Sequence, residues 1–380
     1  MNDRLDERLG DACEPQSSSI AEPLAESAAD IARMGRRAAR RRTTRIWIAV
    51  AASVPVVVIG VAAGAGKAPM TCGVERLALP SGSAPSLVTA MDPTGRYIVG
   101  RTTHASSTSR LDLLIWDNGE LHQADLPGER QVPTGVNADG VVVGTTDIQS
   151  ASGPIDMHAW VYRDRAATLL PGTGSSEARA ISDGGVVVGT DDRRPVLWRS
   201  TTGAPSTLLL PEGAWEGVAT DITADGETIL GTLHPPQTGL NRPYVWLADG
   251  TLRELPLPVV NGTTALSAYA VAIAGDWVAG TAGDDGVPVR WNLRTGEVQA
   301  FPRFRTAGLK ISADGRIPTR DRHSHATLLL SQQATLTLPS LRDRGSFPDV
   351  PKVITQDGLH VAGEASAAGS GTLPVVWHCR

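Results

Sequence analysis

The sequence of 380 residues is poor in cysteine: it has three, too few for a disulfide-dense scaffold or a four-cysteine zinc site. It also lacks a strong charge of either sign, because 35 lysines and arginines face 40 aspartates and glutamates. A nucleic-acid-binding protein would present a basic face, so a net charge of −5 argues against that class. Only one long apolar run is present, which excludes a membrane protein with many spans. Because 41% of the residues are hydrophobic, a wholly disordered chain is excluded too.

Common motifs of catalysis and cofactor binding are missing from the sequence. There is no Gly-x-Ser-x-Gly, the turn that exposes the serine of one hydrolase class. Neither the Gly-x-x-x-x-Gly-Lys-Ser/Thr phosphate loop nor a Gly-x-Gly-x-x-Gly between a strand and a helix occurs. The zinc helix His-Glu-x-x-His is absent as well. We therefore predict no catalytic residue, no metal site and no cofactor.

The single apolar run, residues 46–66, has no charged residue. At about 1.5 Å per residue, a helix of this length spans the ~30 Å hydrocarbon core of a bilayer. Residues 33–45 before it hold seven arginines and no acid, which places the N-terminus in the cytoplasm. We expect a disordered or partly helical cytoplasmic tail at 1–45, a transmembrane helix at 46–66 in the lipid bilayer, and an extracytoplasmic domain at 67–380. A cleaved signal peptide is the alternative, since residues 62–66 are small enough for a peptidase.

A short phrase recurs seven times after the apolar run: an apolar residue, a few polar residues, Asp-Gly or a variant, and a β-branched stretch that ends in glycine. An Asp-Gly pair supplies the positive φ of a tight hairpin turn. The continuous valine runs are typical of strands buried on both faces. The turn glycines lie 40 to 49 residues apart: Gly95, Gly140, Gly185, Gly226, Gly275, Gly315 and Gly358.

Each copy continues with an aromatic-centred strand and then a strand that ends near Leu-Pro or Phe-Pro. Four short β-runs per unit of 40 to 50 residues predict an all-β, seven-bladed β-propeller. The tryptophans recur at one strand position, which indicates packing between blades: Trp116, Trp160, Trp198, Trp246, Trp291 and Trp377. The sixth copy has leucines at 328–330 instead, and its Pro318 predicts a short or bulged second strand. Its third and fourth strands are expected at 326–330 and 334–338.

The phrase apolar-Ser/Asn-x-Asp-Gly-x-Val-Val-Gly, followed by His158, Ala159 and Trp160, resembles the HAF-type extracellular repeats of bacterial β-propellers. The resemblance covers about residues 84–378 and implies the propeller fold and an exported location, but no single activity. The tail and its arginines resemble in composition those of actinobacterial membrane proteins of sigma-factor-linked operons. A zinc-type anti-sigma domain does not fit, because the tail has Cys13 and no histidine.

The seventh copy ends at its third strand, whereas residues 73–80 form an orphan strand before the first copy. We predict that residues 74–79 insert as the fourth strand of the last blade, antiparallel to 373–377, and thereby cover two open strand edges. This pairing places Cys72 beside Cys379, in a compartment where disulfides persist. We predict a disulfide between them; two unpaired thiols are the alternative.

Three residues stand out as candidate binding residues. Trp215 lies off the register of the other tryptophans, in a loop between blades, and could be an exposed binding aromatic. His323 and His325 lie two residues apart and would face the same side of a strand, but a metal site would need further ligands from another blade. The alternative for the histidine pair is a solvated loop beside a strand.

These observations predict a non-enzymatic binding or sensor module, anchored in the cell membrane, that engages an extracytoplasmic protein, glycan or cell-wall ligand. Two alternatives remain open. One is an enzyme with a lyase- or glycosidase-like site in the central channel, which a cluster of carboxylates lining that channel would favour. The other is a membrane partner of a sigma factor that acts through the tail.

Overall fold

The computed structural model describes residues 70–80, 86–103, 111–126, 128–149, 155–306, 310–369 and 371–380. The chain divides into two compact units, residues 1–66 and Lys67–Arg380, and all described residues belong to the second. The predicted tail at 1–45 and helix at 46–66 lie outside the described residues. Within the described ranges, no helix has the length and apolar character needed to cross a bilayer.

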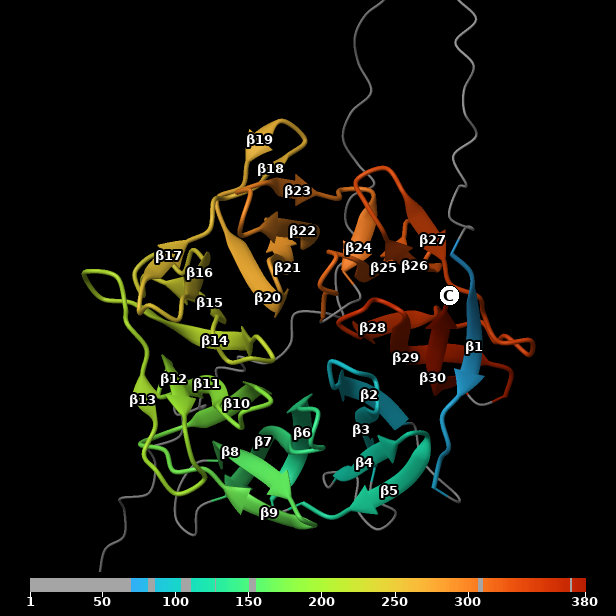
Figure 1. Ribbon diagram of the computed structural model, residues 1–380, viewed down its shortest axis with the longest axis horizontal. Helices are drawn as coiled ribbons and strands as arrows, with labels where there is room; N and C mark the ends of the chain where they lie inside the picture. The colour runs from blue at the N-terminus through green and yellow to red at the C-terminus, as the bar shows by residue number, and fades with distance from the viewer. Residues whose placement is uncertain are drawn as a thin grey trace, which may run out of the picture. The chain divides into compact units, whose positions relative to one another are not determined.

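The second unit is a ring of seven four-stranded antiparallel sheets, which confirms the predicted seven-bladed β-propeller (Figure 1). The first strand of each sheet lies nearest the centre of the ring, and the later strands follow outward. Blades 1 to 3 comprise β2 (Ser86–Met91), β3 (Tyr97–Thr103), β4 (Leu111–Asp117) and β5 (Glu120–Ala124); β6 (Glu129–Val136), β7 (Val142–Gln149), β8 (Ile155–Arg163) and β9 (Ala166–Leu169); and β10 (Ser176–Ile181), β11 (Val187–Asp191), β12 (Arg194–Trp198) and β13 (Ser206–Thr207).

Blades 4 to 6 follow in the same order around the ring, and a small hairpin of β18 (Val259–Val260) and β19 (Thr263–Thr264) separates blades 4 and 5. Their strands are β14 (Glu216–Ile222), β15 (Ile229–His234), β16 (Arg242–Trp246) and β17 (Leu252–Glu254); β20 (Ala268–Ala274), β21 (Trp277–Ala282), β22 (Val287–Asn292) and β23 (Val298–Ala300); and β24 (Phe304–Thr306), β25 (Ile317–Asp321), β26 (Ala326–Leu329) and β27 (Thr335–Thr337).

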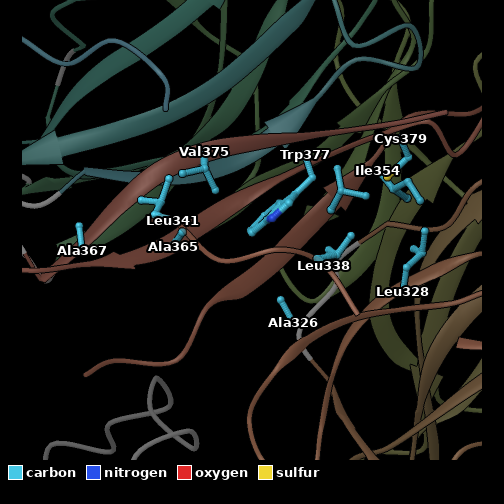
Figure 2. Packing of buried hydrophobic residues seen from close by; sticks show 11 residues of the cluster. Ala326, Leu328, Leu338, Leu341, Ile354, Ala365, Ala367, Val375, Trp377 and Cys379 are labelled. Carbon is cyan, nitrogen blue, oxygen red and sulfur yellow. The ribbon is translucent and has the colours of Figure 1, made fainter. Parts of the chain in front are cut away.

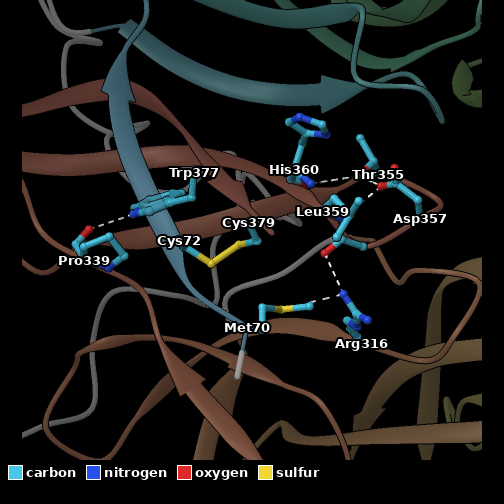
Figure 3. The surroundings of a disulfide bond; sticks show 11 residues. Met70, Cys72, Arg316, Pro339, Thr355, Asp357, Leu359, His360, Trp377 and Cys379 are labelled. Atoms are coloured by element: carbon cyan, nitrogen blue, oxygen red, sulfur yellow. Dashed lines mark hydrogen bonds between the residues drawn. A yellow bond between two sulfur atoms is a disulfide. The ribbon is translucent and has the colours of Figure 1, made fainter. Parts of the chain in front are cut away.

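Blade 7 contains β28 (Val350–Ile354), β29 (His360–Ala367) and β30 (Gly371–Cys379), and its fourth strand is β1 (Cys72–Arg76) from the other end of the unit. The register pairs Val74 with Trp377 and Cys72 with Cys379, as the sequence predicted. A disulfide joins the two cysteines, whose Cα atoms are 4.0 Å apart and which are separated by 307 positions in the sequence (Figure 3). The strand itself ends earlier than expected, at Arg76, although Leu77 N still donates to Pro374 O at 3.0 Å.

The glycine that ends each valine run is required by close packing. In blade 1, the pairing of the first strand with the second shifts register between Val88 and Ala90. A Cβ atom on Gly100 would lie 2.3 Å from the carbonyl oxygen of Leu87 and 3.0 Å from the ring of Trp116. Any side chain there would therefore push against both the backbone of the first strand and the tryptophan of the third.

The recurrent tryptophans join neighbouring blades, as their periodicity predicted. Five of them donate the indole N–H to a carbonyl oxygen at the end of the preceding blade, over 2.7 to 2.8 Å. The Trp377–Pro339 bond of this set lies close to the disulfide (Figure 3). Buried residues of blades 6 and 7 pack around the same ring, among them Leu328, Leu338 and Ile354 (Figure 2). The core of the protein thus consists of clusters between adjacent blades.

Blade 6 departs from the pattern at two positions that lie close together in blades 1, 2, 4 and 5, those of the glycine and the tryptophan. Thr319 replaces the glycine, and its hydroxyl donates to Arg305 O at 2.6 Å. Leu329, opposite Ile317, replaces the tryptophan and is fully buried. The second strand, β25, has five residues, as many as β11 and fewer than the other second strands, and its described pairings contain no bulge despite Pro318.

Candidate functional site

A cavity of about 430 Å³ lies within the ring of first strands. Its wall takes one apolar side chain from each blade. This residue is the last of the first strand in blades 1 to 4 and 7, the last but one in blade 5, and lies five residues beyond the first strand in blade 6. Because these residues come from equivalent positions, they form a closed apolar belt around the axis of the propeller. The belt consists of Met91, Val136, Ile181, Ile222, Ile273, Ile311 and Ile354.

The turns that follow the first strands form the mouth of the cavity, and several are bonded to one another. Asp183 N donates to Ala224 O at 2.9 Å. On the other side of the ring, Ala313 N donates to Gln356 O at 2.8 Å and Gln356 N donates to Pro93 O at 2.9 Å. These bonds between blades make the mouth a rigid frame over much of its circumference.

Blade 5 interrupts this frame. Its first hairpin turns over two residues, Gly275 and Asp276, because Ala274 already pairs with Trp277. Within the described ranges, no hydrogen bond links Gly275 or Asp276 to the turn of a neighbouring blade. Both residues line the cavity. The mouth is therefore asymmetric, with a shorter and unlinked turn at blade 5.

An ion pair crosses the base of the cavity from blade 4 to blade 6. Lys310 Nζ lies 2.6 Å from Asp221 Oδ1, and the other oxygen of Asp221 accepts the backbone N–H of Ile273 at 2.9 Å. The side chain of Asp221 is 2% exposed, so its charge requires these partners. Blade 5 lies between the two residues and contributes the small Ala272 at the same register, which leaves room for the lysine to reach across.

Carboxylates gather on the same side of the mouth. Asp225 and Glu227 belong to the turn of blade 4, and Asp276 belongs to that of blade 5. A hydrogen bond from the Thr223 hydroxyl, at 2.5 Å, together with one from Glu227 N, holds the pKa of Asp225 below its usual range. Asp276 Oδ2 pairs with the exposed Arg294 at 2.5 Å. This side of the cavity is an acidic wall, defined here as Asp225, Glu227 and Asp276.

The predicted binding residues lie elsewhere, and none of them lines the cavity. Trp215 is half-buried in the loop before β14, donates its indole N–H to Glu212 O at 3.0 Å, and meets Tyr244 edge-on at 5.9 Å. Its role as a binding aromatic remains a prediction.

His323 and His325 lie in the turn between β25 and β26, so the expected strand arrangement was wrong for them. Asp321 Oδ1 fixes this turn by accepting the backbone N–H groups of both histidines, at 2.8 and 2.9 Å. The two rings are exposed, with centroids 6.1 Å apart. No group of three or more His, Cys, Asp or Glu side chains among the described residues is arranged to hold a metal ion.

Sequence reasoning missed the ion pair at the base of the cavity. A signal for it was present, because the residue before the belt position is small or apolar in five copies and charged in two. The five are Ala90, Gly135, Ala180, Ala272 and Val353, and the two are Asp221 and Lys310.

No protein-family model and no curated protein matches this sequence. Among solved structures, the β-propeller domain of the Trilobed protease from Pyrococcus furiosus is similar, with 12% identity and a TM-score of 0.51 over 77% of this chain and 95% of that domain. This similarity supports the propeller fold alone. That domain is described as having an open velcro topology, whereas blade 7 here is closed by β1 and a disulfide.

Two further solved structures are more distant. TolB from Acinetobacter baumannii has 17% identity and a TM-score of 0.41 over 56% of this chain, which spans about half (53%) of TolB. The WD40 repeats of RRP9 have 9% identity and a TM-score of 0.49 over 81% of this chain and 97% of that one.

Proposed function

We propose that this protein is a membrane-anchored, extracytoplasmic β-propeller that acts as a non-enzymatic binding or sensor module. Its ligand would be a protein, a glycan or cell-wall material, bound at the mouth of the central cavity. The observation that carries the proposal is the cavity itself, whose 430 Å³ falls within the range of ligand sites and whose charged groups are concentrated on one wall. A rigid frame with one asymmetric side suits selective recognition.

Two features support the location. The uncharged run 46–66 has the length of a bilayer span, and the arginines before it favour a cytoplasmic N-terminus. The Cys72–Cys379 disulfide fits an oxidising compartment, because such bonds are rare in the cytosol. A sigma-factor partnership would depend on residues 1–45, which lie outside the described residues.

Four carboxylates line the cavity, and such a cluster is the observation that would favour the lyase or glycosidase alternative: Asp221, Asp225, Glu227 and Asp276. The contacts of three of them favour binding instead. A glycosidase requires a carboxylic acid whose pKa is raised so that it can donate a proton. Asp221 is instead bound to Lys310, and the Thr223 hydroxyl lowers the pKa of Asp225. Asp276 is bound to Arg294. Three of the four carboxylates are therefore already held by an ion pair or a hydrogen bond, which suits binding better than proton transfer.

Photo-cross-linking in intact cells that carry the full chain tests the proposal. A photoreactive amino acid at Gln356, an exposed residue of the cavity lining that bonds to neighbouring turns through its backbone, is expected to capture one discrete extracytoplasmic species. The matched control is the same amino acid at Arg253, an exposed position on the outer strand β17, which should capture none. Equal capture from both positions, or none from Gln356, would contradict a binding role for the cavity.

Protease added to the same intact cells tests the anchor. It is expected to degrade residues 67–380 and to leave the tail protected, because the apolar run would hold the tail in the cytoplasm. A soluble mature protein that starts near Lys67 would contradict the anchor and support cleavage of a signal peptide.

A further inference from the structure

The distribution of charge around the cavity indicates the class of its ligand. We propose that the cavity binds a primary ammonium or guanidinium group on an aliphatic stem, such as a basic side chain of a peptide or a free alkylamine. This inference rests on the proposed binding function and goes beyond it by naming the chemistry that is recognised.

The cationic end of the ligand follows from the acidic wall. Three carboxylates line this side of the mouth, and of these only Asp276 is already paired with a cation, the exposed Arg294. The one cationic side chain among the described lining residues, Lys310, is already held by Asp221. No side-chain partner for Glu227 occurs within the described ranges, and Asp225 stays ionised because its pKa is lowered. A cation placed there would receive charge-assisted hydrogen bonds, whereas an anion would be repelled.

The apolar belt indicates that the ligand carries its cationic group on an aliphatic stem. The seven belt residues surround the space beside the acidic wall, so a ligand that enters from the mouth meets carboxylates on one side and apolar surface around it. Lysine and arginine bury their methylene stems along apolar surface while the charged head stays with polar partners. An alkylammonium or alkylguanidinium matches both halves of this lining.

The lining also discriminates among cations. No aromatic side chain is among the described residues that line the cavity. Quaternary ammonium groups are recognised mainly by aromatic faces, so the cavity has little to offer them. Primary ammonium and guanidinium groups carry N–H donors, which the carboxylate oxygens of the acidic wall can accept. The N–H donors of the ligand are therefore part of what is recognised.

Isothermal titration calorimetry on the full chain in detergent micelles tests this inference. The probes are 1,5-diaminopentane, agmatine and the peptide Ala-Lys-Ala, and the neutral controls are 1,5-pentanediol and Ala-norleucine-Ala; both peptides are acetylated at the N-terminus and amidated at the C-terminus. We expect the amines to bind at least about tenfold more tightly than their neutral counterparts. Tighter binding of the peptide than of the free amines would identify a protein ligand, and the reverse a small amine; both support the inference.

Variants locate the binding. Asp225→Asn combined with Glu227→Gln should weaken amine binding by about tenfold or more, since two charges are lost while the turn bond from Thr223 is kept. The matched control is Asp357→Asn, which removes a charge from the equivalent turn of blade 7 (Thr355 Oγ1 to Asp357, 2.6 Å) outside the cavity and should change binding less than twofold. If the double variant fails to fold, the salt dependence of the unmodified protein replaces it, because binding to the acidic wall should weaken from 50 to 500 mM NaCl.

The outcomes separate this inference from the proposed function. The proposed ligand class would be overturned if amines and neutral probes bound with equal affinity. It would also be overturned if the affinity for amines changed neither in the double variant nor with salt concentration. A discrete cross-link from Gln356 in cells would then still support the cavity as a binding site. Absence of any such cross-link would instead overturn the proposed function, and with it the inference that rests on it.

Discussion

Replacing Cys72 and Cys379 together by serine is expected to lower the free energy of unfolding by about 5 kcal/mol, because the bond closes a loop of 307 residues. In the chain-entropy model, such a long loop strongly restricts the unfolded chain, and this value is an upper estimate. Guanidinium denaturation of the oxidised protein and of the double variant measures the difference.

The third cysteine provides the control. Cys13 lies in the tail, so Cys13→Ser should leave the denaturation midpoint unchanged, whereas a reductant should move the unmodified protein toward the double variant. The oxidised chain should expose one free thiol when it is denatured. Three free thiols, or a double variant as stable as the parent, would contradict the disulfide or its stabilising effect.

Two sets of contacts hold the place where the ring closes. The disulfide joins β1 to β30 within blade 7, and an ion pair of blade 7 contacts the first strand of blade 1. At the inner edge, Glu364 accepts the backbone N–H of Val88 at 2.8 Å and pairs with Lys352 Nζ at 2.9 Å. Burial raises the pKa of Glu364, although Lys352 opposes this effect. The seam between blades 7 and 1 therefore remains bonded in the double variant, so we expect a less stable propeller rather than an opened one.

The fold could be predicted from the sequence because each residue of the repeat has a local steric role. The turn glycines take a positive φ, as Gly140 does at 76°. The glycine at the end of the second-strand run makes room for the backbone of the first strand and, in blades 1, 2, 4 and 5, for the tryptophan ring. Five of the six recurrent tryptophans bond to the preceding blade. Because these roles recur in nearly every blade, their spacing shows both the number of blades and where the ring must close. The closing strand and its cysteines followed from that count.

The candidate site could not be predicted in the same way, because it depends on residues that break the repeat. Asp221 and Lys310 lie 89 positions apart and meet only because the ring places blades 4 and 6 on either side of a small residue in blade 5. The histidine pair was placed on a strand because alternation was assumed, but the positive φ of Ser324, 65°, belongs to a turn. Periodicity describes what the blades share. Asp225 belongs to the repeated Asp-Gly turn, but Glu227 and Asp276 occupy the variable position after the turn glycine, so the acidic wall depends on two residues that the repeat does not predict.

Gly280→Ala in blade 5 is expected to lower the free energy of unfolding by about 3 kcal/mol, near the upper end for overpacking a buried site. The added Cβ would lie 2.1 Å from the carbonyl oxygen of Tyr269 and 2.9 Å from the ring of Trp291, so backbone and ring would both have to move. Gly73→Ala is the matched control: it also lies in a strand, but a Cβ there meets nothing within 4 Å, so stability should change by less than about 0.5 kcal/mol.

Thermal and guanidinium denaturation of the two glycine variants decide the point. If Gly280→Ala is as stable as Gly73→Ala, the glycine at this position is not required by packing, and the link between the glycine and the tryptophan fails. Blade 6 shows why the link should hold. Its Thr319 occurs together with Leu329 rather than with a tryptophan, so the one blade that keeps a larger residue at the glycine position also lacks the ring that would crowd it.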